Sequence, residues 1–395
     1  MLPVDEARAR IMARMMPVSA ETVPLPDGLG RVLAQPVIAR LTQPPHDMSA
    51  MDGYAMAGGE MEAAVIGAAP AGHPYRGSVG PGQAIRLFTG SVIPDGADAV
   101  VAQEDVTVEG GRITLRTPAV RGQHIRRGGQ DFHEGQTLIP AGTRLGARGI
   151  GLAAAGNCPW LHVYRRPKVA ILATGDEISL PGDPMVAGGI VSSNAHALAA
   201  LVRIGGGDPV VLPIARDDRT AIATATARLG ADLLLTTGGA SVGDHDLVQT
   251  GLMEARFVLD FWQVAMRPGK PLLFGMLGAT PVLGVPGNPV SAFVCAVLFL
   301  MPALARLGGA AEMAPRDSRG RLTVGVPAND RRADHLRATV TEGSDLPLVT
   351  PFQRQDSSLL HVLYSADALV FRAPHAVALE AGAEIEMLRL DWAGY

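Results

Sequence analysis

A glycine-rich segment at residues 236–246 combines an anion-binding type of turn with two carboxylates. It follows an apolar run at residues 232–235, which predicts a buried strand, and precedes residues 247–256, where apolar side chains recur at helical spacing. Glycines let the backbone approach a ligand closely, and the start of the following helix favours an anion. Asp244 and Asp246 indicate a metal ion or a general base, since two carboxylates alone would repel a phosphate. The same residues also suit a tight strand-to-helix connection with Asp246 at the helix start.

Polar side chains also follow the other buried strands expected after residue 165. The apolar runs that predict these strands are residues 168–173, 209–214 and 280–285. The polar residues that follow them are Glu177, Asp217 and Asn288. Strands that alternate with helices predict a parallel sheet, whose ligands bind outside the carboxyl ends of the strands. We therefore expect these side chains to share one site with Asp246, and we expect Asn288 to cap the helix that begins at Pro289.

A stiff turn at residues 263–271 carries two cations. Pro268, Gly269 and Pro271 fix the backbone of this turn. Arg267 and Lys270 on the same turn suit a small oxyanion or a phosphate. The alternative is that both charges are solvated on an ordinary loop.

The composition argues against several classes of protein. The chain has 395 residues and a formal net charge of −4, without a long basic block, so nucleic acid is not an expected partner. Cys158 and Cys295 lie far apart in the sequence and the histidines show no zinc spacing, which fits a reducing cytoplasm. The most apolar run, residues 289–305, is short for a membrane span and contains Pro302, so we expect a buried helix and no membrane partner.

Changes in sequence pattern predict a multidomain protein of the α/β plus β class. Short alternating runs separated by Gly and Pro predict an all-β module inserted in the first domain and a second β module at the end of the chain. The α/β domain is expected to be a doubly wound, mostly parallel core, and the C-terminal module to resemble a β-barrel. The expected domains are an N-terminal discontinuous domain (1–43 and 129–164, with a helix at 4–16), an inserted β module (44–128), an α/β domain (165–308) and a C-terminal β module (314–395).

A series of motifs in a fixed order covers most of the chain. They are Ser49-Ala50-Met51-Asp52-Gly53-Tyr54-Ala55, Thr89-Gly90-x-x-Ile93-Pro94, Thr174-Gly175-Asp176-Glu177, Ser193-Asn194, Gly238-Gly239-x-Ser241-Val242-Gly243-Asp244, Met266-Arg267-Pro268-Gly269-Lys270-Pro271 and Gly284-x-Pro286-Gly287-Asn288-Pro289-x-Ser291. In these motifs the chain resembles the molybdopterin molybdenumtransferase family, which contains the MoeA proteins of bacteria and the homologous domain of gephyrin. The C-terminal module resembles that family by position more than by motif.

The resemblance implies an activity, a cofactor and partners. It implies that the protein inserts molybdate into adenylylated molybdopterin and releases AMP and molybdenum cofactor, with Mg²⁺ as cofactor and molybdate as substrate. It also implies a cytoplasmic homodimer whose active-site cleft is shared between subunits, and it makes other molybdenum-cofactor proteins candidate partners. The residues agree with these substrates, because glycine-rich loops suit the pterin phosphate, a cationic turn suits the oxyanion, and carboxylates suit magnesium.

The resemblance also assigns roles to residues by position. The expected catalytic residues are Asp52, Thr89, Glu177, Asp217 and Asp246, of which Glu177, Asp217 and Asp246 are also the expected metal ligands. The expected substrate-binding residues are Gly238, Gly239, Ser241, Gly243, Asp244, Pro268, Gly269 and Asn288. The expected molybdate residues are Arg267, Lys270, Ser291, Arg337 and Ser357. Gln263 stands where some bacterial relatives have a lysine, so Arg267 and Lys270 are expected to supply the positive charge.

Two other functions fit part of the sequence. A molybdopterin adenylyltransferase has a core that resembles residues 165–308 alone, and the β modules together with the Met51-Asp52-Gly53-Tyr54 motif argue against it. A non-catalytic scaffold of the gephyrin type is the second alternative, and the lack of a long disordered linker argues against it.

Overall fold

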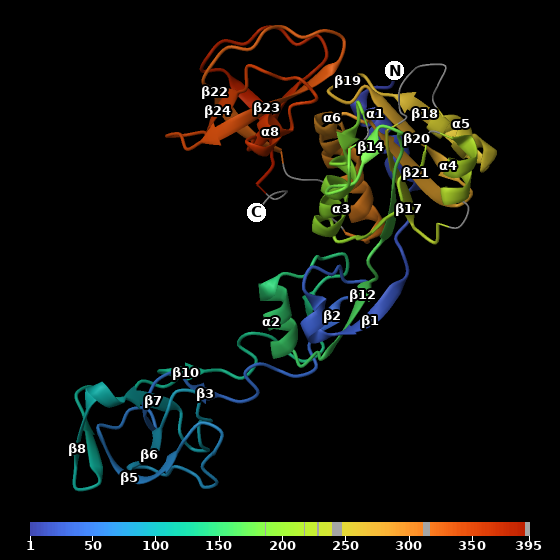
Figure 1. Ribbon diagram of the computed structural model, residues 1–395. Coiled ribbons are helices and arrows are strands. Elements are labelled where there is room, and N and C mark those ends of the chain that lie inside the picture. Colours follow the sequence, from blue (N-terminus) through green and yellow to red (C-terminus); the bar gives the residue numbers. More distant parts are fainter. Residues whose placement is uncertain (186, 217, 227–228, 239–246, 311–316, 392–395) are drawn as a thin grey trace.

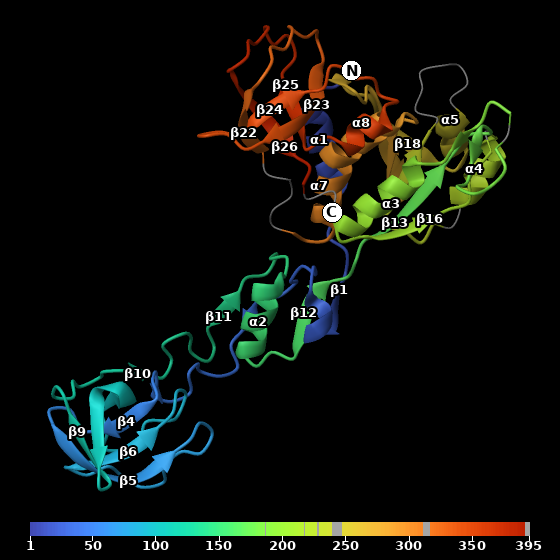
Figure 2. The ribbon, with the colours of Figure 1, turned by 60° about the vertical axis from the view of Figure 1, so that its left-hand side comes forward.

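The protein is elongated, with an α/β part and a C-terminal barrel side by side at one end and a separate β module at the other (Figures 1 and 2). A small part that contains α2 (Ala147–Ala155) lies between these ends. The computed structural model spans residues 1–395 and describes all of them except 186, 217, 227–228, 239–246, 311–316 and 392–395.

The α/β part is built on one six-stranded sheet. The strands, in spatial order, are β16 (Asp208–Val211), β13 (Lys168–Ala173), β17 (Leu233–Thr237), β21 (Thr280–Val285), β20 (Pro271–Leu277) and β18 (Phe257–Gln263). The first four strands run parallel to one another, β20 is antiparallel to β21, and β18 is antiparallel to β20. The prediction of a mostly parallel sheet is therefore confirmed, and the carboxyl ends of β13, β17 and β21 lie side by side.

Helices cover both faces of this sheet because its central strands are apolar on both sides. One face packs against α3 (Asn194–Ile204) and a long continuous helix, while the other packs against α4 (Arg219–Thr226) and α5 (Leu247–Glu254). Along β13, Val169 and Ile171 belong to the first core, and Ala170 and Leu172 to the second. This arrangement confirms the doubly wound core.

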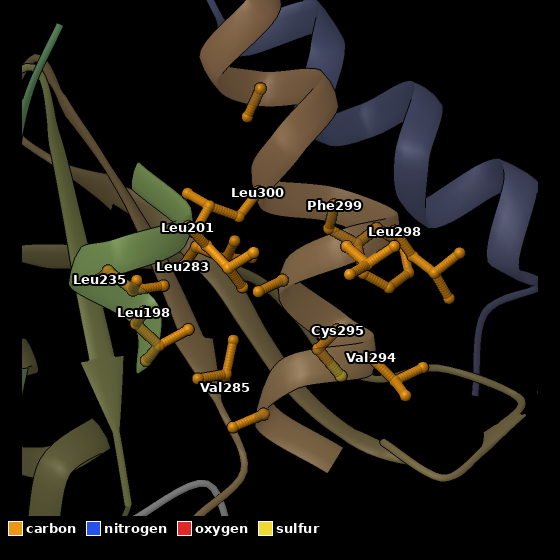
Figure 3. Close-up of a cluster of buried hydrophobic side chains, with 14 of the residues drawn as sticks. Leu198, Leu201, Leu235, Leu283, Val285, Val294, Cys295, Leu298, Phe299 and Leu300 are labelled. Carbon is orange, nitrogen blue, oxygen red and sulfur yellow. The ribbon is translucent and has the colours of Figure 1, made fainter. Parts of the chain in front are cut away.

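The long helix comprises α6 (Pro289–Cys295), a π-helical turn η3 (Ala296–Leu300) and α7 (Met301–Leu307). The π-helical turn lies just before Pro302, whose ring removes one helix hydrogen bond. The segment Pro289–Leu307 is the one described helix long and apolar enough to cross a membrane, but its most apolar window is 83% buried. Figure 3 shows Leu298 and Phe299 on the side of this helix that faces α1. The helix thus forms the centre of a protein core, as the sequence predicts.

Helix α1 (Val4–Arg14) packs on the α/β core, although its place in the sequence grouped it with the N-terminal domain. Ala7, Ile11 and Met15 have no exposed surface and share a core cluster with the long helix. Leu2 adds a parallel bridge to Val264. The apolar stripe of α1 therefore completes the α/β core, while the other predicted domain boundaries stay predictions.

The middle of the molecule is a small part. A stalk made of two antiparallel segments of the chain joins it to the inserted β module. The small part contains β1 (Ala20–Pro24) paired with β12 (Trp160–Tyr164), the short helix η1 (Leu25–Gly28) and α2 (Ala147–Ala155). The stalk, residues 37–49 and 125–139, pairs β2 (Val37–Ile38) with β11 (Thr137–Ile139) and β3 (Met48–Ser49) with β10 (Ile125–Arg126). Between these pairs, Gln43 bridges Phe132, and Asp47 forms an ion pair with Arg127 at 2.5 Å.

The inserted module is a six-stranded sheet. Its order is β7 (Ala99–Ala102), β4 (Gly53–Met56), β6 (Gln83–Leu87), β5 (Glu62–Ala69), β9 (Arg112–Leu115) and β8 (Val106–Glu109), with η2 at Gln103–Asp105. Gly53 opens strand β4 and is buried. A Cβ atom at this position would lie 2.0 Å from the carbonyl oxygen of Val101, so this close backbone approach requires glycine.

The C-terminal part is a closed barrel, which confirms the prediction for that module. Its strands are β22 (Asp317–Leu322), β23 (Ala333–Thr341), β24 (Leu348–Pro351), β25 (Ala368–Arg372) and β26 (Glu384–Arg389), and pairing of β23 with β25 closes the ring. Strand β19 (Met266–Arg267) joins the barrel to the α/β part by parallel pairing with β23, and α8 (Leu360–Tyr364) packs near α6.

The packing of α1 predicts the effect of truncating Ile11. Replacing the buried Ile11 by alanine should lower the free energy of unfolding by about 2–5 kcal/mol, because the cavity forms inside the α/β core. Met16, which is 69% exposed, provides the matched control, and Met16→Ala should change stability little. Thermal or denaturant unfolding checks both, and equal effects of the two variants would contradict the assignment of α1 to the core.

Candidate functional site

A cavity of about 730 Å³ lies at the carboxyl ends of β13, β17 and β21. Its wall includes Thr174, Gly175 and Glu177 after β13, Gly238 after β17, and Pro286, Gly287 and Asn288 after β21. Ser193 and Asn194 at the start of α3 complete one side, and Ser358 of the C-terminal part reaches the rim. The edge of the sheet at which the sequence predicts a ligand therefore carries a cavity.

Asn194 joins two of the loops that shape this cavity. Its Nδ2 donates to Thr237 Oγ1 at 2.9 Å and to the carbonyl oxygen of Gly287 at 2.7 Å. These two bonds tie the first residue of α3 to the end of β17 and to the loop after β21. The loops are thus held at a fixed separation by one side chain.

Glu177 is the predicted acid that the structure places in the cavity wall. Its carboxylate folds back towards Gly175, where a Cβ atom would lie 2.6 Å from Glu177 Oε2. Gly175 has φ of +143° and Gly238 has φ of +97°, so both positions favour glycine. The predicted site residues Asp217, Gly239, Ser241, Gly243, Asp244 and Asp246 lie outside the described residues.

Asn288 contacts the C-terminal part instead of capping the helix that follows it. Its Nδ2 donates to Ser357 Oγ at 2.9 Å, and no side-chain cap bond forms at the start of α6 within the described structure. The backbone N–H of Val290 donates to the carbonyl oxygen of Ser357 at 3.1 Å. The predicted cap bond is therefore wrong, because the Ser357 carbonyl oxygen accepts the Val290 N–H that a side-chain oxygen of Asn288 would otherwise accept. Asn288, Ser357 and the first turn of α6, which contains the buried Ser291, are close together.

Arg267 is engaged by a carboxylate of the barrel. Its Nε donates to Asp334 Oδ1 at 2.9 Å and its Nη2 donates to Asp334 Oδ2 at 2.7 Å. These hydrogen bonds raise the pKa of Arg267, and the buried Asp334 neutralises its charge. The neighbouring Gly269 has φ of +104° and packs against Cys295, while Lys270 is half-buried. The turn is thus fixed to the barrel through Arg267. Pro268 restricts its backbone, and the positive φ and the close approach of Cys295 require glycine at position 269.

Arg337 is the buried cation next to the strip of chain at residues 355–358. It is 1% exposed, and both its backbone N–H and its Nε donate to Gln355 Oε1. Its Nη1 and Nη2 are buried without a hydrogen-bond partner among the described residues. Burial lowers the pKa of this guanidinium, and the charge of Asp356 partly opposes that shift. Two unsatisfied donors of a buried cation are a strong reason to expect an anion.

Asp52 and Thr89 form a pair at the far end of the molecule. Asp52 Oδ1 accepts from the Thr89 backbone N–H at 2.7 Å and from Thr89 Oγ1 at 2.8 Å. The backbone hydrogen bond is the largest cause that lowers the pKa of Asp52, followed by the hydroxyl, while the charge of Arg86 adds a smaller effect. Both residues belong to the inserted module, near β3 and β6, well away from α3 and β17 (Figure 1). One chain therefore brings these two residues together but does not bring them to the cavity.

Sequence reasoning assigned no role to Thr174, Asn194 or Thr237. Thr174 begins the motif Thr174-Gly175-Asp176-Glu177 and Asn194 ends the motif Ser193-Asn194, so membership of these motifs is the signal that could have identified them. Thr237 lies in the glycine-rich segment 236–246 that the sequence singles out, and the structure places it at the end of β17. Their contacts depend on the neighbouring strands and were not visible in the local pattern.

Comparison with known proteins gives a consistent result along the chain. Residues 2–156 match the MoeA N-terminal region (domain I and II), residues 170–306 match a probable molybdopterin binding domain, and residues 319–390 match the MoeA C-terminal region (domain IV). A protein of Nostoc sp. named molybdopterin molybdenumtransferase is 39% identical over 72% of this chain and 68% of its own length. A protein of Mycobacterium tuberculosis named molybdopterin molybdenumtransferase 2 is 32% identical over 96% and 97%. A crystal structure of the molybdopterin biosynthesis MoeA protein from Pyrococcus horikoshii has a TM-score of 0.86 at 28% identity, covering 98% of this chain and 100% of that one.

The bonds to Asp52 predict a measurable shift in its titration. Thr89→Val removes the hydroxyl donor and keeps the backbone donor, so the pKa of Asp52 should rise part of the way towards its ordinary value of 3.8. Because the folded pKa is lowered, this pair stabilises the fold above the unfolded pKa, and the contribution is lost as the pH falls through the folded pKa. Carbon NMR of the carboxyl group checks the shift. Thr107→Val, an exposed change in the same module, is the control, and an unchanged Asp52 titration in Thr89→Val would contradict the role of the hydroxyl.

Proposed function

Since the chain belongs to the molybdopterin molybdenumtransferase family of molybdenum cofactor biosynthesis, we propose that it inserts molybdate into adenylylated molybdopterin and releases AMP and molybdenum cofactor. The observation that carries this proposal is the cavity of about 730 Å³ where three strand ends, the start of α3 and the C-terminal part meet. Family regions also match on both sides of the α/β part, which argues against an adenylyltransferase built from that part alone.

The cavity has the features that a phosphate-containing substrate needs. Gly175 and Gly238 let the backbone approach the ligand closely, and the start of the eleven-residue helix α3 at Asn194 favours a negative group. An apolar side, formed by residues that include Ile178, Ile190 and Val191, suits a planar ring system. The polar floor would therefore hold the phosphate of the adenylylated substrate, and the apolar side would hold a ring.

Magnesium fits the oxygen donors of this cavity. Mg²⁺ is usually held by one or two carboxylates together with substrate phosphates, and Glu177 supplies a carboxylate in the wall. The described residues contain no cluster of three or more His, Cys, Asp or Glu side chains that could bind a metal without substrate. We therefore assign Glu177 as a magnesium ligand that acts together with the phosphate, with Asp217 and Asp246 as its proposed companions. When bound, the ion neutralises the charge on the phosphate.

The proposed molybdate site lies where the C-terminal part meets α6. The strip 355–358 contacts Arg337 through Gln355 and contacts α6 through Ser357. Arg337 contributes two donor atoms, Nη1 and Nη2, that have no partner among the residues the structure describes, and Ser291 and Ser357 contribute hydroxyl groups. Lys270 precedes Pro271, which also lines the cavity. Arg267 has a different part in this proposal, since its pairing with Asp334 fixes the turn that carries Lys270.

The position of Asp52 and Thr89 supports a homodimer with shared clefts. Their pair is ordered by two hydrogen bonds, yet the inserted module that carries it lies at the opposite end of the chain from the α/β part, which contains the cavity (Figure 2). An elongated subunit can present this end to the cavity of a second copy related by two-fold symmetry. The cytoplasm is the proposed location, because Cys158 and Cys295 are both free thiols.

Molybdate-dependent release of AMP tests the function, and mixed dimers test the shared cleft. Asp52→Ala and Glu177→Gln should each abolish most of the turnover of wild type. Random pairing of the two variants should restore about a quarter of wild-type turnover, since half of the dimers carry one intact cleft. Asp52→Ala mixed with Thr89→Val should show no rescue, because Asp52 and Thr89 of one subunit serve the same cleft and each cleft of the mixed dimer then carries one defect. No rescue in the first mixture would overturn the shared cleft, and a wild-type chain that releases no AMP would overturn the function.

The two arginines at the barrel should respond differently to replacement by methionine. Arg337→Met should raise the molybdate concentration for half-maximal AMP release about tenfold or more and leave stability unchanged or higher, because it removes a buried charge with unpaired donors. Arg267→Met should lower the melting temperature, because it leaves the buried Asp334 unpaired. Molybdate titrations and thermal unfolding of both variants check this contrast. A normal molybdate dependence in Arg337→Met would place the oxyanion elsewhere.

A further inference from the structure

Thr174 carries a buried hydroxyl that the described part of the fold leaves unused. The residue directly follows β13, is 2% exposed and forms part of the cavity wall. Its Oγ1 has no hydrogen-bond partner in the described part of the chain. Folded proteins pair nearly all such groups, because a buried hydroxyl without a partner loses its bonds to water and gains nothing in return.

The hydroxyl at the end of the next strand has partners within the protein. Thr237 ends β17 beside Thr174 and is equally buried, at 3% exposed. Its Oγ1 accepts from Asn194 Nδ2 at 2.9 Å and lies 3.5 Å from the carbonyl oxygen of Pro286. Two threonines with the same burial at adjacent strand ends thus differ in one respect, which is that only Thr237 has a structural partner among the described residues.

The glycine beside Thr174 leaves room next to its buried hydroxyl. A Cβ atom at Gly238 would lie 3.0 Å from Thr174 Oγ1 and 2.7 Å from its carbonyl oxygen. Rotation of Thr174 about χ1 moves the hydroxyl between staggered positions without moving the strand. The hydroxyl can therefore meet a ligand atom that enters the cavity from the side of Gly238.

We propose that the Thr174 hydroxyl binds the substrate by donating a hydrogen bond to an oxygen of its nucleotide phosphate. The inference rests on the proposed function and adds a contact to it. Thr174 is followed by Gly175, and Glu177, the carboxylate assigned to magnesium, lies in the same wall. A phosphate oxygen at this position completes the hydrogen bonding of Thr174, and the free protein keeps the donor ready for it.

The test compares Thr174→Val with Thr237→Val, since valine keeps the shape of threonine and removes the hydroxyl. Thr174→Val should retain the wild-type melting temperature within about 2 °C or exceed it, because no protein bond is lost. Thr237→Val should melt at a lower temperature, because Asn194 loses its acceptor. A fall in melting temperature for Thr174→Val would show that its hydroxyl has a structural partner and would overturn the proposal.

Binding measurements complete the test. Thr174→Val should bind AMP about 10- to 100-fold more weakly in calorimetry, the change expected for one hydrogen bond to a charged oxygen. It should lower kcat/KM for AMP release by a similar factor, and Thr174→Ser should recover most of both losses. Unchanged AMP affinity in Thr174→Val would overturn the proposal. Because AMP binding needs no turnover, this measurement decides the inference separately from the proposed reaction.

Discussion

One side-chain amide holds the functional edge of the sheet together. Asn194 donates from a single nitrogen to Thr237 Oγ1 and to the carbonyl oxygen of Gly287, and it sits at the start of a helix that packs on the same sheet. Hydrogen bonds in such a partly enclosed setting are stronger than in water, and leaving one of these groups unpaired would be costly. The spacing of the loops, and with it the shape of the cavity, therefore depends on this residue. The glycines and the carboxylate around the cavity lie on loops whose positions Asn194 maintains.

Much of this edge could be predicted from local sequence patterns. Apolar runs located β13, β17 and β21 closely, and the rule that ligands bind at the carboxyl ends of parallel strands placed Glu177, Gly238 and Asn288 in one neighbourhood before any contact was known. The pattern succeeded because strand type and crossover direction are decided by short segments and by chirality. Topology then fixed which loops meet.

The contacts that local patterns could not predict share one physical cause, which is a partner far away in the sequence. Asn288 was expected to cap its own helix, but it bonds Ser357, 69 residues later. Arg267 pairs with Asp334, 67 residues later, and nothing in the turn that carries Arg267 indicates this partner. An amide or a guanidinium has the same local signature whether it serves its neighbour, a ligand or another domain. Helix α1 shows the same limit, since its apolar stripe does not identify the surface that it covers.

The stalk gives the inserted module a mechanical property. Two chain segments run along it in opposite directions, and they are joined at β2 and β11, at Gln43 and Phe132, at Asp47 and Arg127, and at β3 and β10. A single extended segment could rotate about its backbone bonds, whereas two segments that are joined by non-covalent contacts along their length resist torsion. The module at the tip consequently behaves as the end of a lever arm. A small rotation at the base of the stalk becomes a much larger displacement of Asp52, with little change in the direction in which its carboxylate points.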